Sequence, residues 1–332
     1  MSSPPPYASL TPDLVLTALD SVGIRTDGRL LALNSYENRV YQAGQEDGPP
    51  VVAKFYRPGR WSDAAILEEH AFTLELAERE IPVVPPLAPK PGETLHAHGG
   101  YRFAVYPRRG GRTPEFDHPD TLEWMGRFIG RIHALGALRP YHHRPVLDVA
   151  SFGTVSRDVL LTGGWLPRDL LPAWKSVVDQ ALDLAGHCFQ RAGEFAILRL
   201  HGDCHAGNVL WTEGTETHGP HFVDFDDSRM GPAVQDLWML LSGDRENQVR
   251  QLADILAGYE DFREFDAREL HLVEALRTLR LIHHAAWLAR RWDDPAFPAA
   301  FPWFDTQHYW QERILELREQ IALMQEAPLW PH

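Results

Sequence analysis

The spacing of hydrophobic and polar residues changes about a third of the way along the chain. Upstream, short apolar runs are separated by turn residues such as glycine and proline, which is typical of β-strands. Downstream, apolar residues recur every three or four positions, which is typical of amphipathic helices. Strands are predicted over residues 29–33, 39–43, 51–56 and 101–106. Helices are predicted from Pro12, over 63–79, 122–135, 172–191, 249–259, 267–292 and 306–325, with a strand-and-turn segment over 196–227.

This distribution predicts an α+β protein with two lobes. A chain of 332 residues can form two hydrophobic cores, and its 44% hydrophobic and 23% charged residues are close to the averages for soluble globular proteins. The turn residues at Pro107–Arg112 end the last upstream strand, so we place the boundary there. We expect a small antiparallel-sheet lobe over residues 1–106, a hinge over 107–112 and a mostly helical lobe over 113–332.

The overall charge and the cysteine count exclude several classes of protein. The formal net charge is −14, which argues against a nucleic-acid-binding protein because phosphate binding needs a basic surface. No apolar run reaches the roughly 18 residues of a membrane span, and the first residues lack the features of a signal peptide. The two cysteines cannot form a disulfide framework. We therefore expect a monomeric cytoplasmic protein without nucleic-acid or membrane partners.

The strand-and-turn segment carries the strongest chemical signal. It contains H-G-D-C-H-A-G-N at 201–208, two short apolar runs and then V-D-F-D at 223–226. Phosphoryl transfer from ATP requires a carboxylate near the acceptor hydroxyl, oxygen ligands for magnesium and a cation at the phosphates. Asp203 is the candidate base, and Asn208 and Asp224 offer the amide and carboxylate oxygens that Mg²⁺ prefers. Because Asp224 would bridge the magnesium ions, we count it with Asp203 as a catalytic candidate.

Each of these residues also has a simpler interpretation. An isolated Asp or Asn after a turn is usually a cap or turn residue, but the spaced set is hard to explain in that way. His201 and His205 could bind zinc, although their spacing lacks the helix and the glutamate of the H-E-x-x-H motif. Cys204 could be a nucleophile, but the spacing is better explained by a kinase-type site in which Cys204 is only a neighbour.

The nucleotide-binding half of such a site is expected upstream. Lys54 lies in the apolar strand V-V-A-K-F-Y, which is similar to the V-A-I-K strand of kinases. Because only three of the 32 basic residues are lysines, a lysine inside an apolar strand is a candidate for a specific role. Its carboxylate partner should lie on the next helix, where Glu68 and Glu69 both qualify and the apolar pattern modestly favours Glu69.

Two further segments are candidates for contacts with the nucleotide. The turn over 33–40 joins the first two strands, and its backbone amides and the Ser35 hydroxyl could bind phosphate oxygens, although an ordinary polar turn would look the same. The strand F-A-V-Y-P at 103–107 includes Tyr106 and could meet adenine through its main chain, as could any buried strand. Further along, Asp236 opens a helix, and we expect it to support the catalytic loop.

These motifs resemble those of a known superfamily. H-G-D-x-x-x-x-N-V-L, V-D-F-D and P-A-x-x-D-L resemble the aminoglycoside phosphotransferase and choline kinase superfamily, whose members have protein-kinase-like folds. More closely, L-N-S-Y-E-N-R-V-Y at 33–41, F-A-V-Y-P at 103–107 and L-H-G-D-C-H-A-G-N-V-L-W at 200–211 resemble the stress response kinase A family of bacterial Ser/Thr protein kinases. The resemblance extends from about residue 10 to about residue 325.

The resemblance implies a reaction and a set of roles. The expected reaction transfers the γ-phosphoryl group of ATP to Ser or Thr hydroxyls of proteins in a bacterial stress response, with autophosphorylation as one form of it. ATP and Mg²⁺ are the implied cofactors, and residues 1–106 are the implied ATP-binding lobe. Asp203 is then the base, Asn208 and Asp224 bind magnesium, Ser35 lies at the ATP phosphates, and Lys54 pairs with Glu69.

The sequence also departs from eukaryotic protein kinases and leaves other functions open. Gly202 replaces the arginine of H-R-D and no A-P-E sequence follows, so control by a phosphorylated activation loop is not expected. The motifs do not separate protein hydroxyls from those of an aminoglycoside, choline, homoserine or a sugar, and acidic residues such as Asp226 and Asp227 could line a site for a cationic acceptor. A pseudokinase is disfavoured because the candidate lysine, base and metal ligands are all present.

Overall fold

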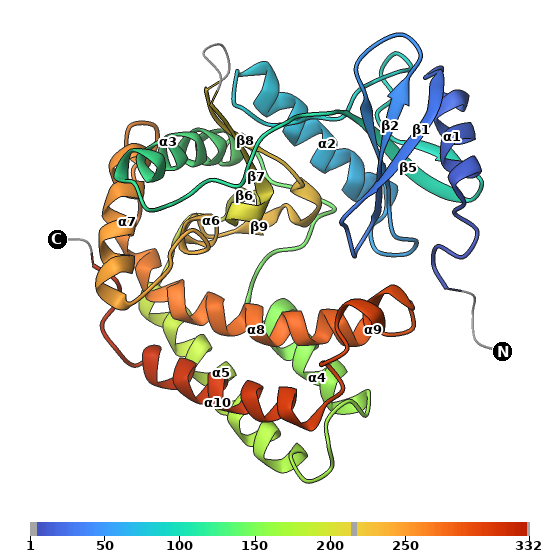
Figure 1. Cartoon of the computed structure of the whole chain (residues 1–332). Coiled ribbons are helices and arrows are strands. Elements are labelled where there is room, and N and C mark those ends of the chain that lie inside the picture. Colours follow the sequence, from blue (N-terminus) through green and yellow to red (C-terminus); the bar gives the residue numbers. More distant parts are fainter. Residues whose placement is uncertain (1–4, 214–217, 331–332) are drawn as a thin grey trace. The chain divides into compact units, whose positions relative to one another are not determined.

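The computed structural model describes residues 5–213 and 218–330, and the chain divides into two compact units (Figure 1). The first unit comprises the described residues of Met1–Pro114 and Ala206–Asp227, together with His142–Arg144. The second unit comprises Glu115–Tyr141, Pro145–His205 and the described residues of Ser228–His332. Each unit therefore contains segments that are far apart in the sequence.

A five-stranded antiparallel sheet forms the centre of the first unit. In spatial order its strands are β1 (Thr26–Leu33), β2 (Arg39–Gln45), β3 (Val51–Phe55), β5 (Tyr101–Pro107) and β4 (His96–His98). The register places Lys54 of β3 opposite Val40 of β2 on one side and Ala104 of β5 on the other. Lys54 thus lies in the middle of the sheet, with paired strands on both sides.

One helix packs against each face of this sheet: α1 (Pro12–Ser21) and α2 (Asp63–Glu78). Under α1, the aromatic side chain of Phe55 forms part of a hydrophobic core with the neighbouring strands. On the other face, Ile66 of α2 packs against β5. Since successive side chains of a strand point to opposite faces, Lys54 lies on the α2 face, opposite to Phe55.

A hairpin from much later in the sequence also belongs to the first unit. Its strands are β7 (Val209–Glu213) and β8 (His218–Phe222), which pair in antiparallel orientation. Main-chain hydrogen bonds join β8 to Pro82 and Val84 (2.8 and 3.1 Å) and join β7 to Arg112 (2.7 and 2.9 Å). The hairpin is flanked by two 3₁₀-helical turns, Ala206–Asn208 and Phe225–Asp227.

The division into units differs from the boundaries predicted from the sequence. The expected helical lobe over 113–332 contained the whole strand-and-turn segment, whereas Ala206–Asp227 groups with the sheet. The physical reason is the set of main-chain hydrogen bonds between the hairpin and segments near residues 82–84 and 112. Because such pairing is non-local, the order of elements along the chain did not reveal it. The expected hinge over 107–112 falls within the first unit, which continues to Pro114.

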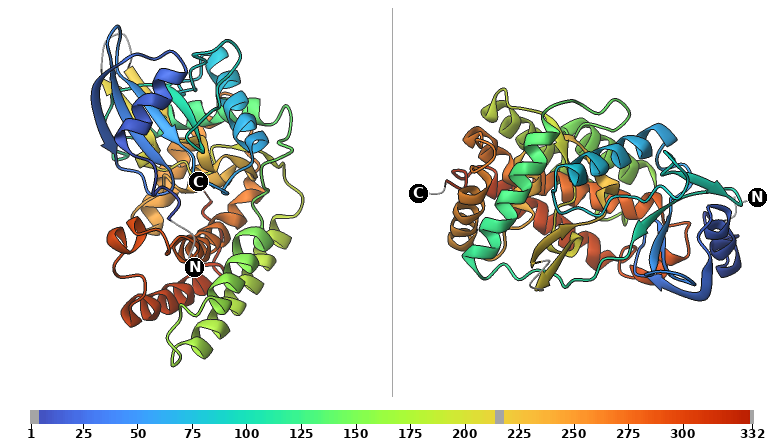
Figure 2. Two further views of the ribbon diagram at one scale, coloured as in Figure 1. Left: turned by 90° about the vertical axis from the view of Figure 1, so that its right-hand side faces the viewer. Right: turned by 90° about the horizontal axis from the view of Figure 1, so that it is seen from above.

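Helices make up most of the second unit (Figure 2). They are α3 (Pro119–Gly136), α4 (Val155–Thr162), α5 (Leu171–Ala192), α6 (Val234–Trp238), α7 (Arg245–Tyr259), α8 (Val273–Arg290), α9 (Ala296–Ala300) and α10 (Gln307–Leu323), with a π-helical turn at Val149–Thr154 and a 3₁₀ stretch at Ala267–Leu272. α5, α8 and α10 lie side by side, and Trp174 and Trp310 meet between α5 and α10 with ring centroids 6.1 Å apart. Two short strands, β6 (Leu198–Leu200) and β9 (Arg229–Gly231), pair next to the H-G-D motif.

The predicted α+β class, with an antiparallel sheet and a mostly helical remainder, is confirmed. The predicted helix over 267–292 consists of the 3₁₀ stretch followed by α8. The short elements β4, α4 and α9 were not predicted, because they are too brief for a clear apolar period. Over residues 5–213 and 218–330, no helix is both long and apolar enough to cross a membrane.

Candidate active site

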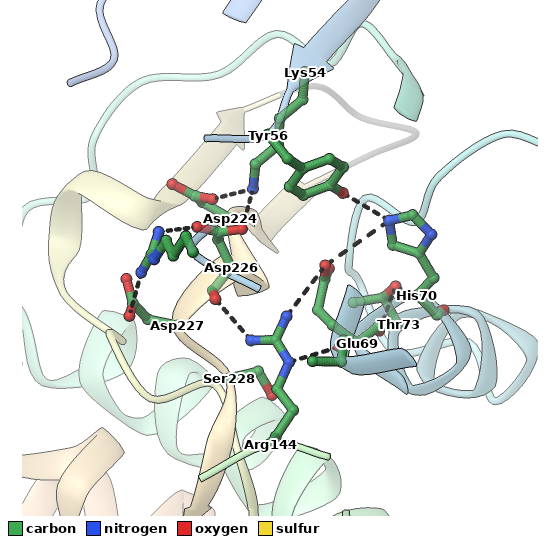
Figure 3. Close-up of polar contacts among 12 residues, drawn as sticks. Lys54, Tyr56, Glu69, His70, Thr73, Arg144, Asp224, Asp226, Asp227 and Ser228 are labelled. Atoms are coloured by element: carbon green, nitrogen blue, oxygen red, sulfur yellow. Dashed lines mark hydrogen bonds and ion pairs between the residues drawn. The ribbon is translucent and has the colours of Figure 1, made fainter. Parts of the chain in front are cut away.

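Lys54 is a buried cation held by two carboxylates (Figure 3). Its Nζ lies 2.8 Å from Oδ1 of Asp224 and 3.3 Å from Oδ1 of Asp226, and the residue is only 7% exposed. Burial alone would lower the pKa of Lys54, but the charges of Asp224 and Asp226 raise it well above its ordinary value. The lysine is therefore charged at neutral pH.

Asp226, the second carboxylate at Lys54, also contacts two other side chains of the first unit. Besides Lys54, it binds the Arg60 guanidinium and accepts a hydrogen bond from Nδ2 of Asn38 (3.1 Å). Burial alone would raise the pKa of Asp226, but the charges of Arg60 and Lys54 outweigh it and lower that pKa to about 2. Asp226 thus joins the lysine to the loop that contains Ser35, instead of facing solvent.

Asp224 and Asn208 lie at the same end of the β7–β8 hairpin. The first residue of β7 pairs with the last residue of β8, and the Val223 N–H donates to the carbonyl of Asn208 (3.0 Å). Asp224 follows with φ of 60°, a left-handed conformation that few residues other than glycine adopt. Its side chain is 54% exposed. A residue held in this costly conformation, with an accessible carboxylate, is typical of a functional site.

The two candidate glutamates of α2 have different surroundings. Glu69 is 2% exposed, and its Oε2 lies 3.9 Å from Nη2 of Arg144 and 3.9 Å from Nε2 of His70. Glu68 is more accessible, and its carboxylate accepts hydrogen bonds from the main-chain N–H groups of His142 (2.7 Å) and His143 (2.8 Å). Both glutamates therefore contact the segment His142–Arg144: Glu68 binds its main chain, and Glu69 lies at the Arg144 side chain.

The ion pairs of Lys54 go to Asp224 and Asp226, so the direct pair expected between Lys54 and Glu69 is not formed. Glu69 is nevertheless close enough to Lys54 for their charges to interact. Burial raises the pKa of Glu69 to about 7, although Lys54 and Arg144 act in the opposite direction. Glu69 thus titrates near neutral pH, unlike an ordinary glutamate.

Ser35 and Tyr106 make internal contacts in the first unit. The Ser35 hydroxyl donates to the carbonyl of Asn38 (3.0 Å) and so closes its own loop. The Tyr106 hydroxyl lies 3.0 Å from that of Tyr56 and 3.4 Å from Nε2 of His70, and burial raises its pKa. The side chain of Tyr106 thus belongs to a buried polar cluster beneath α2, and contacts of its main chain with a nucleotide remain a prediction.

Asp236 supports the loop that contains the H-G-D motif in the second unit. Its carboxylate accepts hydrogen bonds from the main-chain N–H groups of His201 (2.7 Å) and Gly202 (2.8 Å). The oxygen that accepts from His201, Oδ2, also lies 3.0 Å from Nε2 of His133, whose Nδ1 is 3.0 Å from the hydroxyl of Tyr259. This buried chain of polar contacts connects the loop to α3 and α7.

The Asp203 side chain has contacts of its own. Its Oδ1 accepts a hydrogen bond from Nη1 of Arg280 (2.6 Å), and its Oδ2 lies 3.4 Å from Nε2 of His205. The neighbouring Cys204 is completely buried, and burial raises the pKa of its thiol well above the ordinary value. A buried, protonated thiol is a poor nucleophile, which agrees with the interpretation of Cys204 as a neighbour.

Several site residues were missed at the sequence level. Asp226 was interpreted as a possible contact for an acceptor, and neither Arg60, Arg144 nor Arg280 was singled out. The V-D-F-D motif did contain a signal, because it places Asp226 only two residues after the candidate Asp224. The arginines gave no signal, since arginine is the common cation of this chain.

Comparison with known proteins identifies the family. Residues 29–272 match the model of the phosphotransferase enzyme family. The chain belongs to this family. The matched range includes the candidate residues Lys54, Asp203, Asn208 and Asp224. This phosphotransferase is therefore an enzyme of the type that its motifs indicated.

The relatives of this phosphotransferase confirm the resemblance found in the motifs. The chain is 47% identical to stress response kinase A of Salmonella choleraesuis (strain SC-B67) over 323 residues, which are 97% of this chain and 96% of the relative. With the same coverage, it is 46% identical to a Salmonella typhimurium protein named serine/threonine protein kinase RdoA. The chain is thus similar to kinases over nearly its whole length.

Solved structures agree on the fold of this phosphotransferase. An amicoumacin kinase in complex with AMP-PNP and Ca²⁺ superposes with a TM-score of 0.72 at 20% identity, and the match covers 96% of this chain and 95% of that one. A microcompartment-associated aminopropanol kinase gives a TM-score of 0.68 at 17% identity, with 93% and 96% covered. At such identities the similarity concerns the fold alone.

Proposed function

We propose that this phosphotransferase is a Ser/Thr protein kinase that uses ATP and Mg²⁺. The observation that carries the proposal is the buried cation Lys54, held at the acids of the V-D-F-D motif. In phosphoryl transfer, a lysine and an acidic metal ligand act on the same phosphate groups. The protein acceptor is supported by the name of a relative that is 46% identical over 97% of the chain.

The first unit would bind ATP. The Lys54 ammonium would turn from Asp224 to the phosphates, while Asp226 on its other side keeps it charged and in place. The loop closed by Ser35 would offer main-chain N–H groups to the phosphates, and the main chain near Tyr106 would meet adenine. Glu69 would act on Lys54 through space, because its carboxylate is engaged with Arg144.

Asp224 and Asn208 have suitable donors for a magnesium ion. Both offer oxygen atoms at one end of the hairpin, and the Asp224 carboxylate is accessible. Magnesium usually keeps several waters and takes only one or two carboxylates beside the phosphates, so this small donor set is sufficient. A bound ion would neutralise charge on the phosphates. The amicoumacin kinase complex likewise contains a nucleotide analogue and a divalent cation, Ca²⁺.

Asp203 would act on the acceptor. The acceptor oxygen attacks the γ-phosphorus, so a new O–P bond forms while the bond from that phosphorus to the β–γ bridging oxygen breaks. ADP leaves with the bridging oxygen, and the hydroxyl proton passes to the Asp203 carboxylate and then to solvent. Because the transition state is largely dissociative, orientation of the hydroxyl matters more than strong basicity of Asp203.

A coupled assay for ADP release tests the choice of acceptor. Purified protein with Mg²⁺ and ATP is given a generic Ser/Thr protein, and separately a panel of aminoglycosides, choline, homoserine and simple sugars. We expect ADP release with the protein, and an Asp203→Asn variant that is slower by about 10²–10⁴-fold while it still binds ATP. Release with one small alcohol and not with protein would overturn the protein acceptor. Near-normal turnover of the variant would remove Asp203 from its role.

A further inference from the structure

Of the long helices that the structure describes in the second unit, α8 is the most basic. It contains three arginines and one glutamate, whereas α3, α5 and α7 each contain as many acidic as basic residues, leaving histidine aside. One of these arginines, Arg280, lies at the Asp203 carboxylate. This positive charge beside Asp203 contrasts with the chain as a whole, whose formal net charge is −14.

The main chain and the side chain of the catalytic loop are held by different groups. Asp236 binds the main-chain N–H groups of His201 and Gly202, which fixes the path of the loop but not the rotamer of Asp203. The Asp203 carboxylate is held by Nη1 of Arg280 at 2.6 Å, with His205 more distant at 3.4 Å. Hydrogen bonds between two charged groups are short and strong, so Arg280 contributes strongly to the orientation of this carboxylate.

The Arg280 guanidinium has more hydrogen-bond donors than the one that binds Asp203. Its side chain is 40% exposed, and within the part of the chain that the structure describes Asp203 is its hydrogen-bond acceptor. An arginine has five N–H donors, so further donors point to solvent beside the proposed base. An anionic group next to the acceptor hydroxyl could bind them, whereas a cationic group would be repelled.

We propose that Arg280 is the positioning residue for Asp203 and that it selects acceptors whose hydroxyl lies next to an acidic group rather than a cationic one. The proposal rests on the proposed function, in which Asp203 orients the acceptor. An arginine beside this carboxylate is compatible with the reaction, because phosphoryl transfer depends mainly on positioning and electrostatics. The arginine also makes aminoglycosides and choline poor acceptors, because their amino or ammonium groups would approach a fixed guanidinium.

The kinetic test compares Arg280→Gln, Arg280→Lys and a control, Arg290→Gln. Arg290 lies at the exposed end of the same helix. We expect Arg280→Gln to lower kcat by about tenfold or more with little change in the KM for ATP, because a misplaced catalytic group costs rate rather than nucleotide affinity. Arg280→Lys should recover part of this loss, and Arg290→Gln should stay within twofold of the wild type.

A pH profile separates positioning from a merely structural role. Removing the positive charge beside the Asp203 carboxylate should raise the acid-side midpoint of kcat in Arg280→Gln relative to the wild type. Other groups that face or influence Asp203 include His201, Cys204, His205 and His284, and these four are unchanged in this variant. The midpoint of the control should not move.

The acceptor preference is measured with two synthetic serine peptides that differ only in having Glu or Lys beside the serine. The wild type should phosphorylate the Glu peptide at least tenfold faster, and Arg280→Gln should lose this preference. The proposal is overturned if Arg280→Gln matches Arg290→Gln in kcat, midpoint and preference. If the wild type phosphorylates neither peptide but releases ADP with a small alcohol, the protein acceptor fails, and the kcat and midpoint comparisons on that alcohol still decide the role of Arg280.

Discussion

At the scale of single residues, charge in the first unit is concentrated in a place where water is largely absent. Lys54, Asp226 and Glu69 are all almost completely buried, and each has a pKa displaced from its ordinary value. Burying a charge is costly unless it is paired, so these groups stabilise the fold only as a set. Substitution of one member should therefore change both the stability and the pH dependence of the protein.

Asp226→Asn should destabilise the protein by about 3 kcal/mol, because it leaves Arg60 and Lys54 with less negative charge in a buried site. The pKa of Asp226 is lowered from 3.8 to about 2, so its contribution is fully present above pH 3.8 and is lost as the pH falls toward 2. Urea unfolding at neutral and acid pH measures both effects. Asp227→Asn is the matched control, and since Asp227 is 34% exposed it should cost less than about 1 kcal/mol. Equal losses for the two variants would contradict the account.

Glu69 should affect the pH dependence of stability in the opposite direction to Asp226, and a Glu69→Gln variant tests this. Because the pKa of Glu69 is raised from 4.5 to about 7, the folded state holds a proton that the unfolded state releases, and the stability of the wild type falls as the pH rises through this range. Glutamine mimics the protonated form, so the variant should lack this part of the pH dependence, which is on the order of 3 kcal/mol. Unfolding by urea at several pH values between 4.5 and 7 checks it. A variant with the same slope as the wild type would show that Glu69 is ionised throughout.

The sequence proposes candidate residues for the site, whereas most of their contacts are visible only in the structure. Motif spacing makes Asp203, Asn208 and Asp224 the candidate residues, because phosphoryl transfer would use those residue types in that order. The partners Arg144 and Arg280 come from loops and helices with no motif, so only the folded chain reveals them. The expected pair of Lys54 and Glu69 was not formed, because the acids of the hairpin occupy the lysine instead.

At the scale of elements, the helices followed their apolar pattern closely. The predicted helix over 63–79 is α2, whose start is fixed by the Ser62 side chain as N-cap. The predicted helix over 249–259 begins earlier, at Arg245, because Asp244 caps it and the first turn has too few apolar residues to be recognised. The strand register could not be predicted, since it depends on pairing between distant segments.

The close packing of α3 and α7 gives a prediction about glycine. A Cβ atom at Gly126 would lie 1.9 Å from the main-chain oxygen of Ile255, which cannot move without shifting α7. Gly126→Ala should therefore lower the stability by about 2 kcal/mol or more. Gly186→Ala, in the middle of α5 with no atom within 4 Å of the new Cβ, should instead raise it by about 0.5–1 kcal/mol. Thermal unfolding measures the stability of the two variants. Equal effects of the two substitutions would contradict the close packing of α3 against α7.

At the scale of the whole molecule, the kinase motifs are divided between the two units. Asp203 belongs to the second unit, while Asn208 and Asp224 belong to the first. A boundary drawn in sequence order misses this arrangement, because the β7–β8 hairpin hydrogen-bonds to segments near residues 82–84 and 112, which precede it by about a hundred residues or more. The hairpin also brings Asp226 to Lys54 and Arg60.

This arrangement predicts that residues 5–114 do not fold on their own. Without the hairpin, the main chain at Pro82, Val84 and Arg112 loses its hydrogen bonds, and Lys54 loses both of its carboxylates. Circular dichroism of this fragment should show no cooperative thermal transition, whereas the full chain should show one. A cooperative transition of the fragment would mean that the sheet and its two helices are sufficient, and that the hairpin is not an integral part of the first unit.

The central claim is transfer of phosphate from ATP to protein hydroxyls, and one measurement tests it most directly. Purified protein is incubated with Mg²⁺ and γ-labelled ATP, alone and with a generic protein acceptor, beside an Asp203→Ala variant, and the label is assigned by phosphoamino-acid analysis. The account predicts label on serine or threonine that requires Mg²⁺ and disappears in the variant. Label that persists in the variant, or no protein label although ADP is released with a small alcohol, would contradict it.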